Sequence, residues 1–387
     1  MVLGQFPFGI IILMKNFVFE EYENMLDTLR NLCRIPAPSF CEEKRAEYIK
    51  NTLESFGCEG VYIDEAKNVI YEVNCDSGEG FSLFAAHTDT VFPDMEPMPV
   101  IEDDINISNP GVGDDTASVV VLLYAVKYLI SNNLLKDKHV MFVFNSCEEG
   151  LGNLLGIKSV VEKYESKIKR FVSLDSSIGV AVDRAVGSVR YNVKVETEGG
   201  HSFGKFGNEN AINVLSKMVG SIYSIKVPDK PGSKTTYNVG TITGGTSVNT
   251  IAQSAEMLCE YRSSDQDFMK IMDERFGEIF DSYRSEKAKI TVKCVGNRPC
   301  SGYVPENEMR FLRELISDIN AKYGGVNETV FSEGSTDCNI PLSRGIPSIC
   351  IGVYNGHGSH TREEFVEKES LKAGLMIAAH FIESLID

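Results

Sequence analysis

Residues 81–90 read FSLFAAHTDT, and this stretch decides the fold class. Its first six residues are almost all apolar, which is typical of a strand buried on both faces of a parallel or mixed sheet. His87 and Asp89 follow at once. In open α/β sheets, functional side chains gather beyond the carboxyl ends of such strands. The stretch therefore predicts a buried strand that ends in a candidate site, where Asp89 can orient the His87 imidazole.

Strand-like and helix-like runs alternate on both sides of this stretch, which indicates an α/β layer architecture. Pro36 and Pro38 must interrupt the first helical region, because proline removes a backbone donor. We expect strands at 61–63, 69–73, 140–145 and 171–174, and helices at 19–56 (with the proline break), 117–130, 151–165 and 367–386.

The pattern changes between residues 187 and 297. Residues 189–196 (VRYNVKVE) alternate between apolar and polar side chains, as in a sheet with one face in water. The runs that follow complete the order strand, helix, strand, strand, helix, strand, which is the ferredoxin-like arrangement. We therefore predict an α/β domain in two parts, 14–186 and 298–387, interrupted by a smaller α+β domain at 187–297.

The composition excludes several classes of protein. A chain of 387 residues is long enough for two domains. Its 38 basic and 55 acidic residues give a net charge of −17, which argues against nucleic acid or an anionic membrane as partner. Ten cysteines without a C-x-x-C pair remove the usual signal for a zinc ribbon or a thioredoxin. Unpatterned thiols suit a reducing compartment, so we expect a cytoplasmic protein.

The first 14 residues, MVLGQFPFGIIILM, resemble the hydrophobic part of a signal peptide. However, no Lys or Arg precedes the apolar run, and no small-residue cleavage site follows it. The run is also too short to span a bilayer as a helix. Because the sequence after Met14 resembles an ordinary start, we expect residues 1–13 to be a disordered or mis-started tail.

Two pairs of neighbouring acids lie next to the ends of predicted elements. Asp114 and Asp115 lie in the glycine-rich turn GVGDDT just before an apolar helix. A helix N-cap with an acid in the first turn explains one of them, but explains the pair less well. Glu148 and Glu149 follow the strand at 140–145. A solvated surface pair is the plain alternative, although such pairs seldom end a buried strand.

Asp175 follows a further strand, and His360 lies in the glycine-rich stretch GHGSHTREEFV. His357, three residues earlier, could take the same role. Each of these elements has a structural explanation when it is taken alone. Because strand ends converge in space, the set together predicts a metal site.

The ligand types narrow the choice of metal. Two imidazoles with several carboxylates and no thiolate pair suit Zn²⁺, with Mn²⁺ or Co²⁺ possible. These histidines and carboxylates are more ligands than one catalytic zinc ion needs, whereas two ions about 3.5–4 Å apart would use all of them. A phosphatase with Asp115 or Asp175 as nucleophile is the competing chemistry. That reading lacks a D-x-D-x-T element in these loops.

Six motifs in order, HTDT, GVGDDTAS, CEEG, SLDSS, GGHSFGKFGNENAI and GSHTREEFV, resemble those of the M20 metallopeptidases. That family includes peptidase T-like tripeptidases, carboxypeptidases and aminoacylase-type deacylases, and the resemblance runs from about residue 20 to the C-terminus. It implies a zinc-exopeptidase-like, mixed-sheet α/β catalytic domain with an inserted ferredoxin-like dimerisation (lid) domain. Thr116 departs from the pattern, since many members carry Lys there.

The resemblance also implies a role for each matching position in the catalytic domain. Asp114 would bridge two zinc ions, Glu148 would be the general base on the water that bridges them, and Asp89 would support His87. Glu364 falls where the family usually has Glu after the last histidine. The implied metal ligands are His87, Asp114, Glu149, Asp175 and His360.

Three further positions match in the inserted domain. His201 would reach a neighbouring subunit's active site and stabilise the developing oxyanion. Asn249 and Arg262 match positions that contact substrate, and an arginine suits a substrate carboxylate through a bidentate pair. A surface salt bridge is the plain alternative for Arg262.

The resemblance therefore implies a homodimeric dinuclear zinc hydrolase that cleaves short peptides, as a di- or tripeptide exopeptidase of the peptidase T type. An N-acyl-amino-acid deacylase with the same site is the close alternative. A non-catalytic metal-binding member is a third reading. The presence of all five ligand positions and of Glu148 argues against it.

Overall fold

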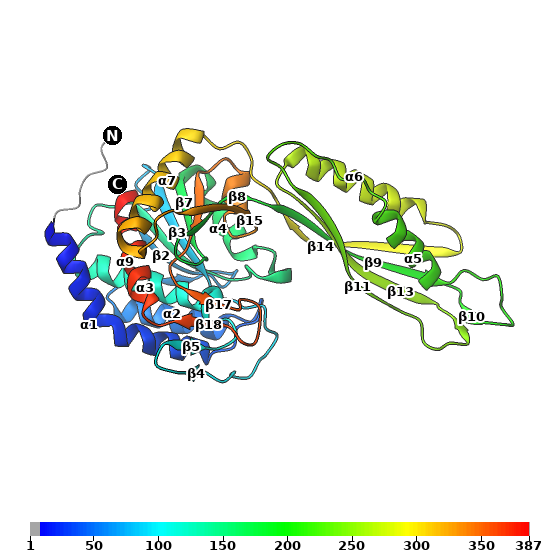
Figure 1. Cartoon of the computed structure of the whole chain (residues 1–387), viewed down its shortest axis with the longest axis horizontal. Coiled ribbons are helices and arrows are strands. Elements are labelled where there is room, and N and C mark those ends of the chain that lie inside the picture. Colours follow the sequence, from blue (N-terminus) through cyan, green and yellow to red (C-terminus); the bar gives the residue numbers. More distant parts are fainter. Residues whose placement is uncertain (1–7, 387) are drawn as a thin grey trace. The chain divides into compact units, whose positions relative to one another are not determined.

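The computed structural model describes residues 8–386. They divide into two compact units (Figure 1). The first unit contains the described chain up to Arg184 together with the chain from Tyr303 onwards, and the second contains Ala185–Gly302. The range 187–297, expected from the sequence to be an inserted domain, lies within the second unit.

A mixed eight-stranded sheet forms the centre of the first unit. β3 pairs in parallel with both β6 and β7, and β16 pairs in parallel with β7, whereas β2 and β8 run antiparallel to their neighbours β6 and β16. Every residue of β3 and β6 is buried, as their apolar sequences predicted. In sheet order, the strands are β1 (Tyr62–Ile63), β2 (Val69–Val73), β6 (Val140–Asn145), β3 (Phe81–His87), β7 (Ile168–Leu174), β16 (Ser348–Ile351), β8 (Val180–Ala185) and β15 (Val330–Gly334).

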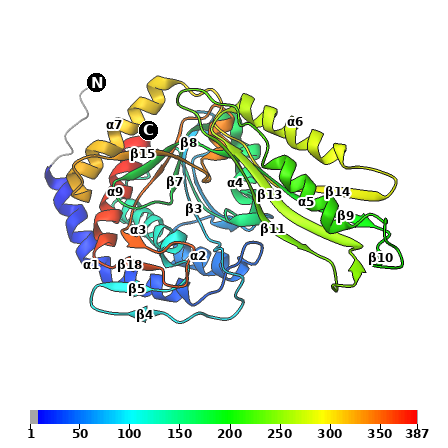
Figure 2. The ribbon, with the colours of Figure 1, turned by 45° about the vertical axis from the view of Figure 1, so that its right-hand side comes forward.

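Helix α3 (Ser118–Ser131) is buried along most of its length and packs against β3 and β7. It also contacts α1 (Phe8–Cys33) and α9 (Ser370–Leu385), and Figure 2 shows these three helices side by side. Burial of each large apolar side chain of α3 contributes about 1.5–3 kcal/mol, so this helix anchors the core. The remaining helices are α2 (Glu43–Ser55), α4 (Leu155–Tyr164), α7 (Glu306–Ile319) and α8 (Asn339–Ser343).

The beginning of α1 corrects one prediction. The tail expected at residues 1–13 is helical from Phe8 onwards, and Met14 is fully buried. The second half of the apolar run that resembled a signal sequence is therefore the start of helix α1, and residues 1–7 lie outside the described residues. The predicted proline break is confirmed, because α1 ends at Cys33 and α2 begins at Glu43.

A small second sheet in the first unit joins distant parts of the chain. Its strand β18 pairs with β5, and Phe365 lies opposite Ser108. This pairing brings the C-terminal segment beside the turn that carries Asp114. In sheet order, the strands are β17 (Gly356–His357), β18 (Phe365–Glu367), β5 (Asn106–Ser108) and β4 (Ile101–Glu102).

The second unit is an antiparallel sheet with two helices. Its sheet order is β11-β13-β9-β14, and α5 and α6 pack against β9 and β13. This order matches the ferredoxin-like arrangement predicted from the sequence. A two-stranded ribbon of β10 (Gly200–His201) and β12 (Thr250–Ile251) extends from it. The main elements are β9 (Gly187–Thr197), α5 (Ala211–Ile222), β11 (Thr235–Gly244), β13 (Ser254–Ser263), α6 (Gln266–Ser282) and β14 (Ala288–Arg298).

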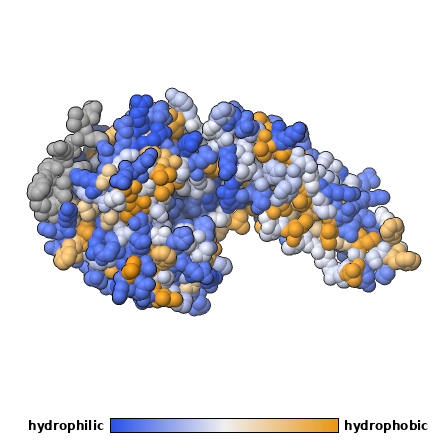
Figure 3. Space-filling model, in the orientation of Figure 1, coloured by the Kyte–Doolittle hydropathy of each residue, from blue (hydrophilic) through white to orange (hydrophobic). Residues whose placement is uncertain are grey.

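The surface of the first unit is largely hydrophilic on the face drawn in Figure 3, with apolar residues scattered among the polar ones. Within residues 8–386, every helix is too short or too polar to cross a lipid bilayer. All ten cysteines lie in this part of the chain, and none of them forms a disulfide.

Candidate metal centre

Acidic and histidine side chains meet at one edge of the main sheet of the first unit. His87 is the last residue of β3, Glu148 and Glu149 follow β6, and Asp175 follows β7. Because β3 is parallel to both of its neighbours, the carboxyl ends of the three strands lie at the same edge. The sheet topology thus brings together residues that are spread over 88 positions of the sequence, from His87 to Asp175.

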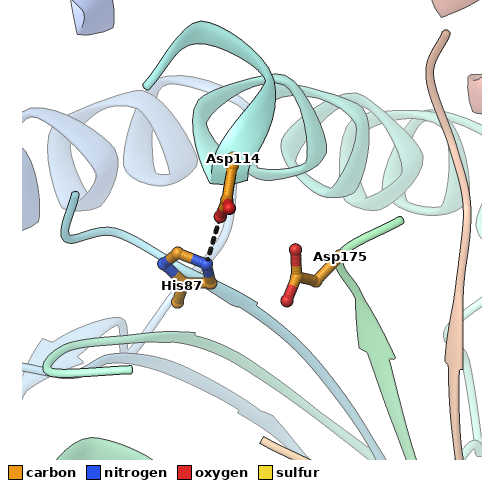
Figure 4. A group of neighbouring side chains, drawn as sticks. All are labelled: His87, Asp114 and Asp175. Carbon is orange, nitrogen blue, oxygen red and sulfur yellow. Dashed lines mark hydrogen bonds and ion pairs between the residues drawn. The ribbon is translucent and has the colours of Figure 1, made fainter. Parts of the chain in front are cut away.

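Asp114 lies between two histidines. Its Oδ1 atom lies 3.0 Å from His87 Nε2, and its Oδ2 atom lies 3.1 Å from His360 Nε2. Asp114 belongs to the turn Val112–Ala117 just before α3, and its own backbone, with a φ of −95° and a ψ of 95°, is not helical. Figure 4 shows its carboxylate pointing from this turn toward His87, with Asp175 across from both. The two oxygens of one carboxylate therefore face two different imidazoles.

Six side chains form three groups that could hold a metal ion. Within each group, one nitrogen or oxygen ligand atom from every residue lies within 4.8 Å of the others. Asp114 is shared by two of the groups, and all ligand atoms are imidazole nitrogens or carboxylate oxygens, which suits Zn²⁺, Mn²⁺ or Co²⁺. The groups are His87–Asp114–Asp175, Asp114–Glu149–His360 and His87–Glu148–Glu149.

The electrostatics of the centre also fit a cation. Burial, together with the nearby charges of Asp114 and Asp115, raises the pKa of Asp175 well above its usual value. Burial likewise raises the pKa of Asp115 well above its usual value. A buried carboxylate cluster of this kind is costly unless positive charge compensates it. Hydrogen bonds to Asp114 and Glu149 raise the pKa of His360 to about 10, which shows the same excess of negative charge.

Asp89 fixes the backbone of the two glutamates. Its Oδ1 atom accepts a hydrogen bond of 2.9 Å from Glu148 N, and its Oδ2 atom accepts one of 3.0 Å from Glu149 N. Ser39 Oγ donates a third, of 2.6 Å, to Oδ2. His87 Nδ1 lies 3.5 Å from Asp89 Oδ1 and 3.1 Å from the Asp89 carbonyl oxygen. Asp89 therefore supports the Glu148–Glu149 backbone as well as the imidazole for which sequence reasoning proposed it.

Glu364 holds the Asp114 turn from the other end of the chain. Its carboxylate is buried and accepts hydrogen bonds from the backbone N–H groups of Gly111 (2.6 Å), Gly113 (3.0 Å) and Asp114 (2.8 Å). A Cβ atom at position 113 would lie 2.8 Å from a Glu364 oxygen, so this close approach requires glycine. Burial raises the pKa of Glu364 to about 7. Sequence reasoning noted the position but assigned it no role.

Arg45 is a buried residue of the site region that sequence reasoning missed. It is 3% exposed, and its guanidinium donates to the carbonyl oxygens of Ile35 (2.8 Å) and Thr88 (3.0 Å) and to Thr116 Oγ1 (3.1 Å). Thr116 Oγ1 in turn donates to the Gly111 carbonyl oxygen. Thr116, the residue that departs from the family pattern, thus links Arg45 to the Asp114 turn. A polar helix residue gives no sequence signal of such burial.

The two candidate histidines near the C-terminus, His357 and His360, have different surroundings. His360 has a φ of 66° in the loop between β17 and β18, and its Nε2 atom lies 3.2 Å from Glu149 Oε1 as well as close to Asp114. His357 lies in β17, with its ring near that of Phe365. The structure therefore brings His360, and not His357, to the acidic residues.

The three remaining predicted residues lie in the second unit. His201 Nδ1 accepts hydrogen bonds of 3.3 Å from the backbone N–H groups of Phe203 and Gly204. The carbonyl oxygen of Asn249 accepts a hydrogen bond from Ser202 N, so these two loops are adjacent. Arg262 donates two hydrogen bonds to Glu260, at 2.8 and 3.1 Å. Their roles toward substrate stay predictions.

Comparison with known proteins decides the family. A sequence profile described as "Peptidase family M20/M25/M40" matches residues 83–384, which is most of the chain. The chain belongs to this peptidase family. The prediction of an enzyme of the M20 metallopeptidase class is thereby confirmed.

Curated relatives of this M20 family member include a deacetylase. The N-acetyldiaminopimelate deacetylase of Bacillus subtilis is 23% identical over 323 residues, which cover 78% of this chain and 84% of that protein. The protein YqjE of the same organism is 23% identical over 311 residues, covering 76% of this chain and 79% of that protein.

Solved structures share the fold. A tripeptidase from Staphylococcus aureus has a TM-score of 0.74 and 24% identity, covering 94% of this chain and 98% of that one. A dinuclear metal-binding M20 peptidase from Bacillus subtilis has a TM-score of 0.65 and 16% identity, covering 94% and 97%. The predicted mixed-sheet α/β fold class is confirmed by these likenesses.

Proposed function

We propose that this chain is an exopeptidase that hydrolyses an amide bond of di- or tripeptides with two Zn²⁺ ions per chain, Mn²⁺ or Co²⁺ being possible substitutes. One observation carries the proposal. The two oxygens of Asp114 face His87 and His360 separately, at 3.0 and 3.1 Å. A carboxylate in this position can bridge two ions.

The chain's own residues divide into two ligand sets around Asp114. His87 and Asp175 form one group with Asp114, and Glu149 and His360 form another. This division uses all five predicted ligands and leaves Glu148 outside both sets. When bound, two divalent cations polarise the scissile carbonyl and acidify the attacking water.

Glu148 is the general base of the proposed reaction. Its side chain is nearly buried, and one of its carboxylate oxygens lies within 4.8 Å of ligand atoms of His87 and Glu149. Its carboxylate accepts a proton from water while the water oxygen attacks the carbonyl carbon. It then donates that proton to the amine nitrogen as the C–N bond breaks, which yields a free carboxylate and a free amine.

His201 is proposed to donate a hydrogen bond to the developing oxyanion. Because its Nδ1 atom accepts from two backbone N–H groups, a neutral imidazole here carries its proton on Nε2. The Nε2–H group is then available as a donor. We propose that it serves the active site of a second subunit in a homodimer, and that Arg262 and Asn249 contact the substrate.

A second candidate function is the deacylation of N-acyl amino acids by the same site. The curated relatives named as N-acetyldiaminopimelate deacetylases favour it. The stretches GGHSFGKFGNENAI and STDCNIPLSRGIP, which resemble the peptidase T-like branch, favour peptides instead. The two reactions differ in the shape of the group that must fit beside the amide.

A substrate screen tests the proposal. The metal-reconstituted chain is incubated with dipeptides, tripeptides and N-acetyl amino acids, and the products are identified by mass spectrometry. Release of a terminal residue from peptides, absent in Glu148→Gln, is the expected result. Release of acetate with inert peptides would favour the deacylase. Turnover of neither class by a metal-loaded chain would contradict both candidates.

A further inference from the structure

We propose that Glu42 is a positioning residue for Glu148 and Glu149, and that it acts through the backbone of Cys147. This inference rests on the proposed function, because it assigns Glu42 a part in the same reaction. Glu42 lies just before α2, 105 residues from Cys147, and its side chain is completely buried.

Two of the three hydrogen bonds that Glu42 accepts come from Cys147. Its Oε1 atom accepts hydrogen bonds from Cys147 N at 3.1 Å, from Cys147 Sγ at 3.2 Å and from Phe40 N at 2.9 Å. Cys147 has a φ of 55°, in the left-handed region that is unfavourable for a non-glycine residue. The carboxylate thus holds Cys147 at the point where the chain leaves β6 and turns toward the glutamates.

Three consecutive N–H groups of this turn donate to buried carboxylates. Cys147 N donates to Glu42, and the N–H groups of Glu148 and Glu149 donate to Asp89. The turn is therefore fixed from two sides by two side chains from separate elements. If one acceptor is lost, the dihedral angles of Cys147 are free to change and both glutamates move with them.

Lys67 supplies the charge that a buried Glu42 needs. Its Nζ atom lies 3.7 Å from Glu42 Oε2 and 2.7 Å from Glu43 Oε1. Glu43, in contrast, is exposed and touches no part of the turn among its described hydrogen bonds. The neighbouring pair thus offers a test residue and a matched control that share one cation.

The test compares Glu42→Ala, Glu42→Gln and Glu43→Ala in the full chain. Loss of a residue that orients a metal ligand typically costs 10–100-fold in metal affinity or activity, and we expect about that for Glu42→Ala, in kcat more than in KM. Zn²⁺ affinity is measured by calorimetric titration of the metal-free chain, and kcat and KM with the peptide found in the screen. Glu42→Gln should keep most of the Zn²⁺ affinity and most of the kcat. Its amide oxygen can accept hydrogen bonds from the same two backbone N–H groups, those of Cys147 and Phe40. Glu43→Ala should match the unmodified chain.

A double-variant cycle separates positioning from general damage. In a Glu148→Gln background, Glu42→Ala should lower kcat by a smaller factor than in the unmodified chain, because coupled residues are not additive. Full additivity, or unchanged kcat and Zn²⁺ affinity in Glu42→Ala, would overturn the proposal. If Glu42→Ala does not fold, Glu42→Asp, whose shorter side chain withdraws the oxygen from Cys147, takes its place. An unmodified chain that binds Zn²⁺ but turns over no substrate refutes the proposed function, while the Zn²⁺ titrations still decide the role of Glu42.

Discussion

The carboxylate of Glu364 accepts a hydrogen bond of 2.8 Å from the backbone N–H of Asp114, although the two residues are 250 positions apart. Through this contact, the C-terminal segment that carries His360 also holds the turn that carries the proposed bridging ligand. The pairing of β18 with β5 places the two segments side by side. The position of Asp114 therefore depends on the last part of the chain.

Replacement of Glu364 tests this dependence. Glu364→Ala leaves three buried N–H groups without an acceptor, so we expect lower thermal stability and a loss of about 10–100-fold in Zn²⁺ affinity or activity. Calorimetric titration and thermal unfolding measure the two effects. The exposed neighbour provides the control Glu363→Ala. Equal Zn²⁺ affinity in the two variants would show that the hydrogen bonds to Glu364 are not needed for metal binding.

Metal content should follow the two ligand sets around Asp114. After reconstitution, we expect about two metal equivalents per chain, and a chelator should abolish activity. Asp175→Asn should lose mainly one equivalent, whereas Asp114→Asn should lose both because it belongs to both sets. Elemental analysis of the purified variants checks the counts. Intact activity in a chain shown to hold no metal would contradict the dinuclear proposal.

The neighbours Glu148 and Glu149 should fail in different ways. Glu148→Gln should keep its metal and its fold while turnover falls by about 10²–10⁴, the usual contribution of a positioned base. Glu149→Gln should instead weaken metal binding. Metal analysis beside steady-state kinetics separates the two effects. The reverse pattern would mean that the roles within the pair are exchanged.

Mixed dimers test whether His201 acts across subunits. Chains with His201→Ala and chains with Glu148→Gln should each be nearly inactive. If His201 serves the partner's site, a mixed dimer contains one site with both groups intact and recovers part of the activity. Subunit exchange is followed by native mass spectrometry. Confirmed exchange without recovered activity would rule out a role in trans.

An ion pair remote from the centre predicts a pH dependence of stability. Hydrogen bonds from Arg30 lower the pKa of Glu102 from 4.5 to about 2. A depressed folded-state pKa contributes stability above the unfolded value, and this contribution is lost as the pH falls from about 4.5 to about 2. After discounting for solvent screening, Glu102→Gln should lower the free energy of unfolding by about 0.2–1 kcal/mol at pH 7.

Denaturant unfolding at pH 7 and at pH 3 measures this contribution. The difference between Glu102→Gln and the unmodified chain should shrink at the lower pH. Exposed Glu23 in α1 provides the control Glu23→Gln. A difference that stays constant with pH would assign the effect to packing and not to charge.

The sequence predicted those parts of the fold whose signal is local. Residues 81–86 and 140–145 were recognised as strands because nearly all their side chains are apolar, and the structure buries them on both faces. The site residues at their ends were found for the same reason. The first part of α1 was missed because an apolar run at residues 8–14 looks the same in a targeting segment and in an ordinary helix.

The supporting side chains could not be predicted, because their partners are distant in sequence. Arg45 reads as a solvated residue of a polar helix, and Glu42 as an ordinary acid before that helix. Both are buried by contacts with loops 43 to 105 residues away. Only the tertiary pairing of strands and turns shows that these charges hold the Asp114 and Glu148 segments in place.

The order of strands in the main sheet has a consequence for synthesis on the ribosome. β16 lies between β7 and β8, yet it is made more than 150 residues after β8. Synthesis adds about 5–20 residues per second. The edges of β7 and β8 that will pair with β16 therefore stay unpaired for about 10–30 s. Such edges are templates for aggregation. Until Ser348–Ile351 leaves the exit tunnel, we expect a chaperone that binds unfolded chains to bind this incomplete sheet.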